Sequence, residues 1–393
     1  MFDPIVIVGA ARTPMGGFQG DFTGATASDL GGVAIKAALD RAGVDKNDVD
    51  EVLMGCVLPA GQGQAPARQA LHKAGLGWNV PATTLNKMCG SGMKTVMNAV
   101  DQLKAGNGSV VVAGGMESMT NAPHILPTMR SGQRIGHGAV KDHMFLDGLE
   151  DAYEEGRLMG SFAEECAEKY QFTREQQDEY ALKSLENALN AQASQAFEGE
   201  IEPVTVRTRK GPVAVSVDEQ PANARPEKIP SLKPAFKKDG TVTAANASSI
   251  SDGAAALILM RESEAKEKGL PIRAYIRSHA SHAQEPNWFT TAPVPAMKQV
   301  LADTGWLVED VDLWEINEAF AVVPMAAMKE LGMDREKLNV NGGACALGHP
   351  IGASGARILV TLLHALENRD KTKGVASLCI GGGEGTAVAI ERA

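Results

Sequence analysis

Hydrophobic residues recur at helical spacing in two long stretches of the chain, Met93–Leu103 and Ile358–Leu366. In each stretch the apolar positions follow the three-to-four-residue period of a helix with one buried face. A short continuous apolar run that ends in glycines comes after each of them, at Val110–Ala113 and Val375–Ile380. Runs of this length favour buried strands. Strands that alternate with helices predict an α/β fold built from parallel βαβ units.

The two halves of the chain repeat one another. Asp48–Gly55 aligns with Asp310–Asn317 at an offset of 262 positions, and the same offset places Gly90 on Gly352, where each helical stretch opens. One register that holds over several elements is stronger support than any single match. The repeat therefore predicts two similar α/β halves, related like the subunits of a dimer but joined in one chain.

The first half contains an insertion. Its closing strand is predicted at Gly253–Leu259, whereas the second half closes at Gly385–Ile390, directly after its glycines. The segment between Glu117 and Asp252 thus has no counterpart, and we expect an inserted, loop-rich domain with a long helix around Thr173–Ala196. The predicted domains are the first half at residues 1–120 plus 241–268, the insertion at 121–240 and the second half at 269–393.

The end of the insertion is basic. Pro203–Gly240 contains eight Lys or Arg residues against four Asp or Glu, in a chain whose net charge is −10. Two interpretations remain open: a solvated surface loop, or an electrostatic seat for the phosphates of a small ligand. The negative overall charge argues against a general nucleic-acid-binding protein, which normally has a basic face.

Length and composition indicate a globular protein of two or three domains. The chain has 393 residues, 44% of them hydrophobic and 22% charged, which excludes wholesale disorder. Its five cysteines form no CxxC pair, so free thiols in a reducing compartment fit better than a disulfide framework. The N-terminus lacks the pattern of a secretory signal, and the longest apolar run, Ala254–Met260, is too short to span a bilayer. We therefore expect a cytoplasmic protein that does not bind a membrane.

Cys89 is a candidate nucleophile. It follows the strand-like Pro81–Asn86 and directly precedes a helix that begins near Gly90. The free N–H groups and the positive dipole end of a helix N-terminus stabilise thiolate over thiol. Gly90 and Gly92 leave room for an acyl group beside the sulfur. The alternative is a small buried hydrophobic residue, which is what most lone cysteines are.

Three further candidates belong to the second half. His349 precedes the equivalent helix within a glycine-rich turn, and histidine is the side chain best suited to take a proton at neutral pH. Cys379 ends a strand and is followed by backbone N–H groups that are free to bind an oxyanion. Asn317 ends another strand, where its amide can orient a water or donate to a developing enolate. For each of the three a purely structural role, in a loop, the core or a helix cap, is the alternative.

Two other site classes use the same residue types. A metal site is weakly supported, because Cys89, His349 and Cys379 lack the CxxC or HxxxH spacing of metal ligands, and we expect no metal. A cysteine peptidase also pairs Cys with His. It does not explain the second cysteine beside a triple-glycine run, or the duplicated halves.

Five motifs occur in one order along the chain: Asn86–Met93, Gly114–Met119, Asn317–Ala321, Asn341–Gly352 and Cys379–Gly383. Together they resemble the signatures of the thiolase family, most specifically its biosynthetic branch of acetyl-CoA acetyltransferases. The resemblance covers essentially the whole chain. It implies two duplicated βαβαβαββ halves in five α-β-α-β-α layers with an inserted loop domain, which agrees with the architecture that the repeat predicts.

The resemblance also implies a two-stage reaction, the reversible condensation of two acetyl-CoA molecules to acetoacetyl-CoA and CoA. Cys89, activated by His349, matches the cysteine that becomes acylated. Cys379 matches the acid/base that takes the α-proton of acetyl-CoA or activates the thiol of CoA in reverse. The backbone N–H groups of Cys89 and Gly381 match one oxyanion hole. His349, with a water held by Asn317, matches a second one, for the enolate.

For coenzyme A the family uses the inserted domain, which agrees with the basic stretch. The residues that match its CoA and acyl contacts are Ser248 near the pantetheine arm, Arg225 near the nucleotide, and Met159, Phe236 and Phe289 in the acyl pocket. Arg225 is displaced by one residue from the family spacing, and Leu158 stands where a histidine is common. The resemblance implies no cofactor besides the CoA substrates, and a homotetramer built as a dimer of dimers.

One departure affects the substrate. Relatives selective for the shortest acyl groups often have Met-Gly where this chain has Phe289-Thr290. A 3-ketoacyl-CoA thiolase of broader specificity, for longer or 2-methyl-branched substrates, is therefore the alternative activity. A decarboxylating enzyme of the ketoacyl synthase type is disfavoured, because such enzymes lack a second active-site cysteine at the place of Cys379. A non-catalytic lipid-carrier relative would not need the four reactive residues together.

Overall fold

The computed structural model describes residues 3–209 and 211–393. Within this part of the chain, the sequence repeat is a repeat of structure. The first half contains β1 (Ile5–Arg12), α1 (Ala27–Ala42), β3 (Glu51–Gly55), α2 (Pro66–Lys73), β4 (Ala82–Leu85), α3 (Ser91–Lys104), β5 (Val110–Ser118) and β10 (Ser251–Arg261). The second contains β11 (Ala274–Ala283), α8 (Pro293–Thr304), β12 (Leu313–Ile316), α9 (Val322–Leu331), α11 (Ser354–Asn368), β13 (Lys373–Ile380) and β14 (Glu384–Arg392).

The main strands form one continuous sheet in the order β12-β13-β14-β11-β1-β10-β5-β3-β4, and the short β2 (Gly16–Gly17) pairs with β10. The halves join edge to edge where β1 pairs with β11. Strands β4, β3 and β5, at one end of the sheet, are parallel, and so are β12 and β13 at the other end. The closing strands β10 and β14 run antiparallel to β5 and β13. Each half thus has the predicted parallel units and adds one antiparallel pair.

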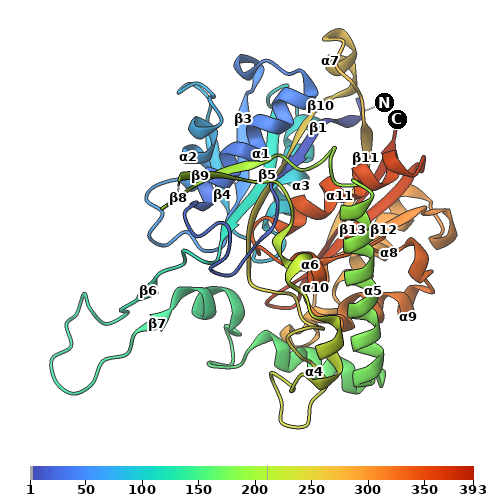
Figure 1. Cartoon of the computed structure of the whole chain (residues 1–393). Helices are drawn as coiled ribbons and strands as arrows, with labels where there is room; N and C mark the ends of the chain where they lie inside the picture. The colour runs from blue at the N-terminus through green and yellow to red at the C-terminus, as the bar shows by residue number, and fades with distance from the viewer. Residues whose placement is uncertain (1–2, 210) are drawn as a thin grey trace.

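Two helices occupy the middle of the molecule. The apolar faces of α3 and α11 share one core cluster with strands of both halves, and the two helices lie between the two parts of the sheet (Figure 1). α1 and α2 pack on the outer face of the first half, and α8 and α9 on that of the second. This arrangement gives the expected five layers. The N-terminal turns of α3 and α11 touch, since a Cβ on Gly355 would lie 2.3 Å from the nitrogen of Met93.

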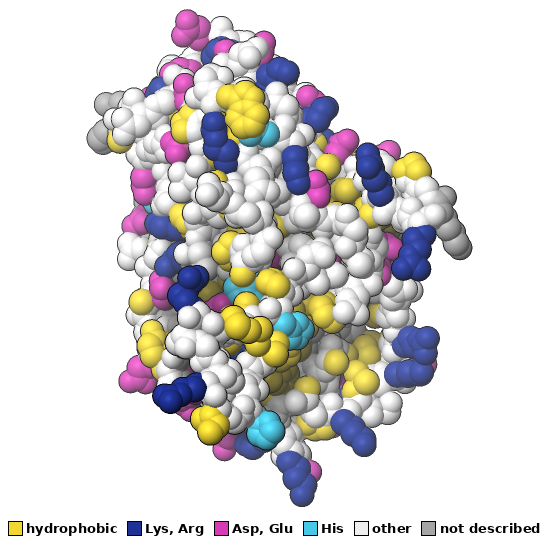
Figure 2. Space-filling model, turned by 90° about the vertical axis from the view of Figure 1, so that its left-hand side faces the viewer, with side chains coloured by type: hydrophobic (Ala, Val, Ile, Leu, Met, Phe, Trp, Pro, Cys, Tyr) yellow, Lys and Arg dark blue, Asp and Glu magenta, His cyan; other side chains and the backbone are white. Residues whose placement is uncertain are grey.

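The insertion contains β6 (His124–Ile125), β7 (Lys141–Asp142), a π-helix (Phe145–Leu149), α4 (Met159–Tyr170), α5 (Arg174–Ala193), β8 (Val204–Thr208), β9 (Gly211–Val215) and α6 (Glu219–Asn223). The predicted long helix is α5, and Thr173 caps it through a reciprocal pair of hydrogen bonds with Gln176. The β6–β7 segment projects from the body of the molecule (Figure 1). Figure 2 views that side and shows hydrophobic and histidine side chains gathered on it. The bounds of the insertion as a domain stay a prediction.

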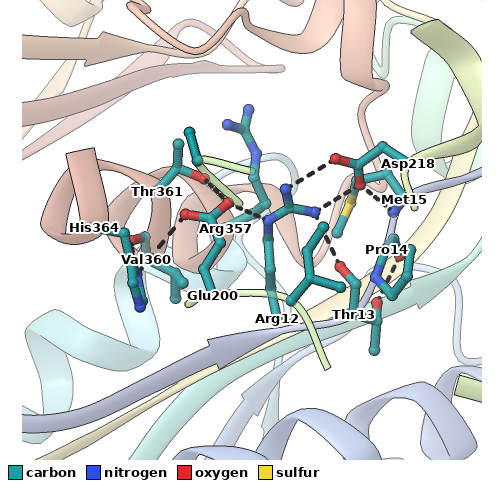
Figure 3. Close-up of polar contacts among 12 residues, drawn as sticks. Arg12, Thr13, Pro14, Met15, Glu200, Asp218, Arg357, Val360, Thr361 and His364 are labelled. Carbon is teal, nitrogen blue, oxygen red and sulfur yellow. Dashed lines mark hydrogen bonds and ion pairs between the residues drawn. The ribbon is translucent and has the colours of Figure 1, made fainter. Parts of the chain in front are cut away.

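A buried charge cluster attaches the insertion to both halves (Figure 3). The Arg12 guanidinium of β1 donates to Glu200 at 2.6 Å and to both oxygens of Asp218 at 2.6 and 2.9 Å. The Thr361 hydroxyl of α11 donates to Glu200 at 3.1 Å. Removing one partner would leave an uncompensated buried charge, which is strongly destabilising.

The basic stretch divides between two places. The β8–β9 hairpin packs on the first half through Val204, Val206 and Val215. Arg225 and Lys228 instead line a pocket formed with α5 and the short α10 (Ala344–Leu347). Lys210, in the same stretch, lies outside the described residues. Only the second part of the basic stretch is therefore near the elements that carry the candidate site.

Candidate active site

Cys89 lies in the turn between β4 and α3, as predicted. The Ser91 hydroxyl closes this turn, since it accepts a hydrogen bond from the Lys87 N–H at 2.8 Å and donates to the Met88 carbonyl at 2.7 Å. Met88 has a φ of +48°, a left-handed conformation that is rare for its residue type. Cys89 as a whole residue is partly exposed, while its sulfur is buried. A held, strained turn of this kind fixes the direction of the side chain that follows it.

Burial raises the pKa of the Cys89 thiol to about 11, although N–H groups of Gly381 and of Cys89 itself favour the thiolate. Backbone N–H groups thus favour the thiolate, as expected of this turn, but desolvation is the larger effect and the sulfur rests as the thiol. Attack by this sulfur then requires a base that removes its proton. The Gly381 N–H donates a hydrogen bond to the Cys89 sulfur. Gly381 is the residue whose N–H was predicted to donate to the oxyanion.

His349 lies in the turn before α11 and is almost fully buried. Its Nδ1 is 2.5 Å from the hydroxyl oxygen of Ser354, and that hydroxyl donates its only proton to the Pro350 carbonyl at 2.8 Å. Nδ1 must therefore carry the ring proton, which leaves the lone pair on Nε2. Burial, followed by the charge of Arg357, lowers the pKa of His349 to about 3. The ring is neutral at pH 7, and its Nε2 carries no proton.

Asn317 follows β12 and lies next to this nitrogen. Its backbone N–H donates to the Ser377 carbonyl at 3.0 Å, and its Nδ2 is 3.4 Å from Nε2 of His349. Its Oδ1 is buried and accepts no hydrogen bond from any described residue. A buried acceptor without a partner is a place where a water or a substrate group is expected to bind.

Cys379 lies at the end of β13 and is completely buried. Burial raises the pKa of its thiol well above the usual range, and the charge of Cys89 raises it further. The two thiols are therefore neighbours. The turn that follows contains Gly382 and Gly383, with φ of +91° and +92°, a conformation that favours glycine.

The contact between α3 and α11 brings these groups together. Cys89 packs against an apolar cluster that includes Val57, Leu58 and Ile351, and Ile351 is two residues from His349. Asn317 connects His349 to β13, where Cys379 lies. Residues from four distant motifs thus converge at the N-terminal ends of two helices, α3 and α11, and at the ends of two strands, β12 and β13.

The predicted acyl-pocket residues lie on the side of Cys379. Met159 and Phe236 pack against the buried apolar cluster that contains Phe289 and Cys379. Phe320 connects them, because its ring lies 5.9 Å from that of Phe236 and 6.4 Å from that of Phe289, edge to face. The sequence patterns predicted no role for Phe320. Its place in the Asn317–Ala321 motif was the available signal.

The predicted CoA contacts lie around a pocket of about 400 Å³. Arg225 and Lys228 provide its positive charge, and Ser249 and Cys345 line it on the side of His349. Ser248 does not line this pocket but adjoins it, and its N–H donates to the Ala319 carbonyl at 3.0 Å. Arg225 therefore lines this pocket, and Ser248 is next in sequence to its lining residue Ser249.

Among residues 3–209 and 211–393, no three His, Cys, Asp or Glu side chains are grouped so that they could hold a metal ion. No helix in the same part of the chain is long and apolar enough to cross a membrane.

Comparison with known proteins defines the class. The profile of the thiolase N-terminal domain matches residues 5–263, and that of the thiolase C-terminal domain matches residues 270–392. The chain belongs to the thiolase family.

Within the family, the chain is similar to acetyl-CoA acetyltransferases. It is 53% identical to the acetyl-CoA acetyltransferase of Cupriavidus necator over 390 residues, which cover 99% of each chain. It is 54% identical to that of Escherichia coli over 389 residues, 98% of each. The crystal structure of the Bacillus anthracis acetyl-CoA acetyltransferase superposes with a TM-score of 0.97 at 44% identity, covering 100% of this chain and 99% of that one.

Proposed function

We propose that the protein is an acetyl-CoA C-acetyltransferase that interconverts two acetyl-CoA molecules with acetoacetyl-CoA and CoA. The observation that carries this proposal is the convergence of two thiols and a neutral imidazole whose Nε2 carries a lone pair and no proton. A thioester Claisen condensation needs a nucleophile that holds the acyl group and a separate base for the α-proton. A single sulfur cannot do both at once.

In the first stage, Nε2 of His349 takes the Cys89 proton as the sulfur attacks the thioester carbonyl. The N–H groups of Cys89 and Gly381 stabilise the oxyanion of the tetrahedral intermediate. The C–S bond to CoA then breaks, and CoA leaves as the thiol with the proton from His349. Cys89 remains as a thioester.

In the second stage, Cys379 takes the α-proton of acetyl-CoA, and the carbanion attacks the acyl carbon on Cys89. Cys379 acts in its thiolate form, which is a strong base because burial raises its pKa, as a weakly acidic carbon requires. His349 and a water on Asn317 stabilise the enolate oxygen. Cys89 leaves as a thiolate and takes from Cys379 the proton that came from the α-carbon, which restores the Cys379 thiolate. Thiolysis is the reverse of these steps.

Coenzyme A binds with its phosphates near Arg225, its pantetheine arm past Ser248, and its acyl group against Met159, Phe236 and Phe289. Support comes from the pocket of about 400 Å³ and its two basic side chains. No further cofactor takes part in these steps.

The test is thiolysis of acetoacetyl-CoA by CoA, followed spectroscopically for the wild type, Cys89→Ser and Cys379→Ser. We expect turnover by the wild type, and a loss of about 10³-fold or more in each variant, since removal of one member of a catalytic unit costs that much. Cys166→Ala, which removes a buried thiol of α4, is the matched control and should retain activity. A folded wild type without turnover would overturn the proposal.

A second candidate is a thiolase for longer or 2-methyl-branched substrates. It is favoured by Phe289-Thr290, both buried in the pocket wall, in place of Met-Gly. Equal or better kcat/KM on a 2-methyl-branched or longer straight-chain 3-ketoacyl-CoA would establish it. A strong preference for acetoacetyl-CoA would exclude it.

The protein acts in the cytoplasm as a homotetramer, a dimer of dimers. The β6–β7 segment supports self-association, because Met129, Ile135 and Val140 on it are 63%, 89% and 60% exposed. Exposed apolar residues gathered on one projecting segment are typical of an interaction surface. A monomeric mass by light scattering would contradict the tetramer.

A further inference from the structure

Glu117, at the end of β5, is a buried carboxylate that the mechanism above does not use. It is completely inaccessible to solvent. Its Oε2 accepts from the N–H groups of Val57 and Gly352, each at 2.9 Å, and its Oε1 accepts from the Leu58 N–H at 3.1 Å. The Cys56 thiol donates to Oε1 at 3.5 Å. Backbone dipoles thus compensate this charge.

The segments bound by Glu117 both reach the reacting groups. Val57 and Leu58 follow β3, in the first half, and belong to the apolar cluster that contacts Cys89. Gly352 ends the turn of the second half that begins at His349. A Cβ on Gly352 would lie 2.5 Å from Oε2, so only glycine permits this approach. The Glu117 side chain therefore binds both the loop that packs against the nucleophile, Cys89, and the turn that carries its base, His349.

We infer that Glu117 is a positioning residue for the thiolase reaction: its ionised carboxylate holds the loop after β3 and the His349 turn in register beside Cys89. This inference rests on the proposed function. It assigns a role to the Gly114–Met119 motif, which contributes no group to the reaction itself.

The charge of Glu117 also acts on Cys89. After burial, it is the interaction that raises the pKa of the Cys89 thiol. A carboxylate here therefore adds a smaller effect to that of burial, which is the main reason why Cys89 stays protonated until His349 accepts the proton. Removal of the charge should ease thiolate formation while it loosens the geometry, and these two effects can be measured separately.

Burial raises the pKa of Glu117 itself to about 7, against the opposing effect of its N–H donors. When the carboxyl is protonated, one of its oxygens becomes a donor that faces a backbone N–H. The hydrogen bonds of Glu117 to the loop after β3 and to the His349 turn therefore weaken as the pH falls through about 7. The other titratable groups around it are Cys56 after β3, Cys89 before α3, His349 before α11 and Asp252 on β10, which pairs with β5 beside it. His349 has a pKa of about 3 and the thiols titrate far above 7, so they do not change charge there.

The experiment compares the full chain with Glu117→Gln and Glu117→Asp. In Glu117→Gln an NH₂ group faces a backbone N–H, and we expect kcat for acetoacetyl-CoA thiolysis to fall about 10²-fold, as for small displacements of reacting groups. The KM for CoA should change less than about threefold, because the CoA pocket is separate. The acid limb of the kcat profile near pH 7 should disappear. The rate at which iodoacetamide alkylates Cys89 is followed by mass spectrometry as a function of pH. The midpoint of this pH dependence should move to lower pH in Glu117→Gln and stay near that of the wild type in Glu117→Asp.

Glu164→Gln is the matched control. Glu164 is a buried carboxylate of α4 that accepts the N–H groups of Thr241 and Val242, away from Cys89. It should retain kcat and the alkylation profile.

Wild-type kcat in Glu117→Gln, or an unchanged pH profile with unchanged alkylation, would overturn the inference. The alkylation measurement needs no turnover. If the wild type fails to cleave acetoacetyl-CoA, the proposed function fails while the effect of Glu117 on Cys89 is still decided.

Discussion

The two halves of the molecule share their fold but not their chemistry. Each has the same order of strands and helices and sends one helix, α3 or α11, to the centre. The pairing of β5 with β3 and of β13 with β12 shows that Met116 stands in the first half where Cys379 stands in the second. Packing has kept the core positions apolar in both halves. The reacting positions at the strand and helix ends were free to differ.

The buried carboxylates differ in the same way. Glu117 of the first half binds backbone N–H groups, one of them from the second half. Glu318, beside Asn317 in the second half, accepts from Tyr180 at 3.0 Å and from Ser184 at 2.7 Å, both on α5 of the insertion. Glu117 therefore connects the two halves, whereas Glu318 attaches the insertion to the Asn317 loop. Neither carboxylate contacts a reacting atom, so each acts on the site only by holding the surrounding segments in place.

The largest expected effect on kcat that tests the difference between the halves concerns two serines at the same helix position. Ser91 and Ser354 are the first residues of α3 and α11, and each donates its hydroxyl proton to a preceding carbonyl. Ser354 also accepts the Nδ1 proton of His349. We expect Ser354→Ala to lower kcat about 10²-fold, because His349 loses control of its tautomer, and Ser91→Ala to lower it about tenfold.

The measurement is kcat and KM for thiolysis, with the unfolding midpoint of each variant. Similar losses of stability in the two variants, with the larger loss of kcat in Ser354→Ala, would support the assigned tautomer. Equal losses of kcat would mean that both serines only hold their turns, and the asymmetry would then lie elsewhere.

Much of the fold was predictable because it rests on local pattern. The helical period predicted α3, α11 and α5, and a change in the offset between the two repeats located the insertion. The contacts of the site were less accessible. Glu117 and Gly352 are 235 positions apart, and no periodicity links them. The pKa of Cys89 depends on how deeply other elements bury it, which overrode the local expectation from the helix N-terminus.

A smaller effect should appear where the halves touch. A Cβ on Gly92 would lie 2.8 Å from the nitrogen of Ala356, and one on Gly355 would lie 2.3 Å from that of Met93. Both contacts are to backbone, which cannot rotate away. We expect Gly92→Ala and Gly355→Ala each to lower the free energy of unfolding by about 1–3 kcal/mol, more for Gly355.

Denaturant unfolding measures this, with exposed Lys36→Ala of α1 as a near-neutral control. Activity should fall together with stability, since the contact sets the distance between the Cys89 and His349 turns. A variant that keeps both stability and activity would show that α3 and α11 can separate without consequence.

The smallest effect is on the pH dependence of stability, to which His349 of the second half should contribute and Cys89 of the first half should not. The pKa of His349 is about 3 in the folded protein, below its ordinary value of 6.5. The unfolded chain therefore binds more protons between these values, and stability is lost as the pH falls through this window. From pH 7 to pH 5 this contribution amounts to about 2 kcal/mol, which His349→Gln should abolish. Cys89→Ser should leave this pH dependence unchanged, because the Cys89 thiol does not titrate between pH 5 and pH 7 in either the folded or the unfolded chain. Urea unfolding at the two pH values decides it: equal slopes in the wild type and His349→Gln would mean that folding does not lower the pKa of His349, which would contradict the buried, neutral ring assigned to it.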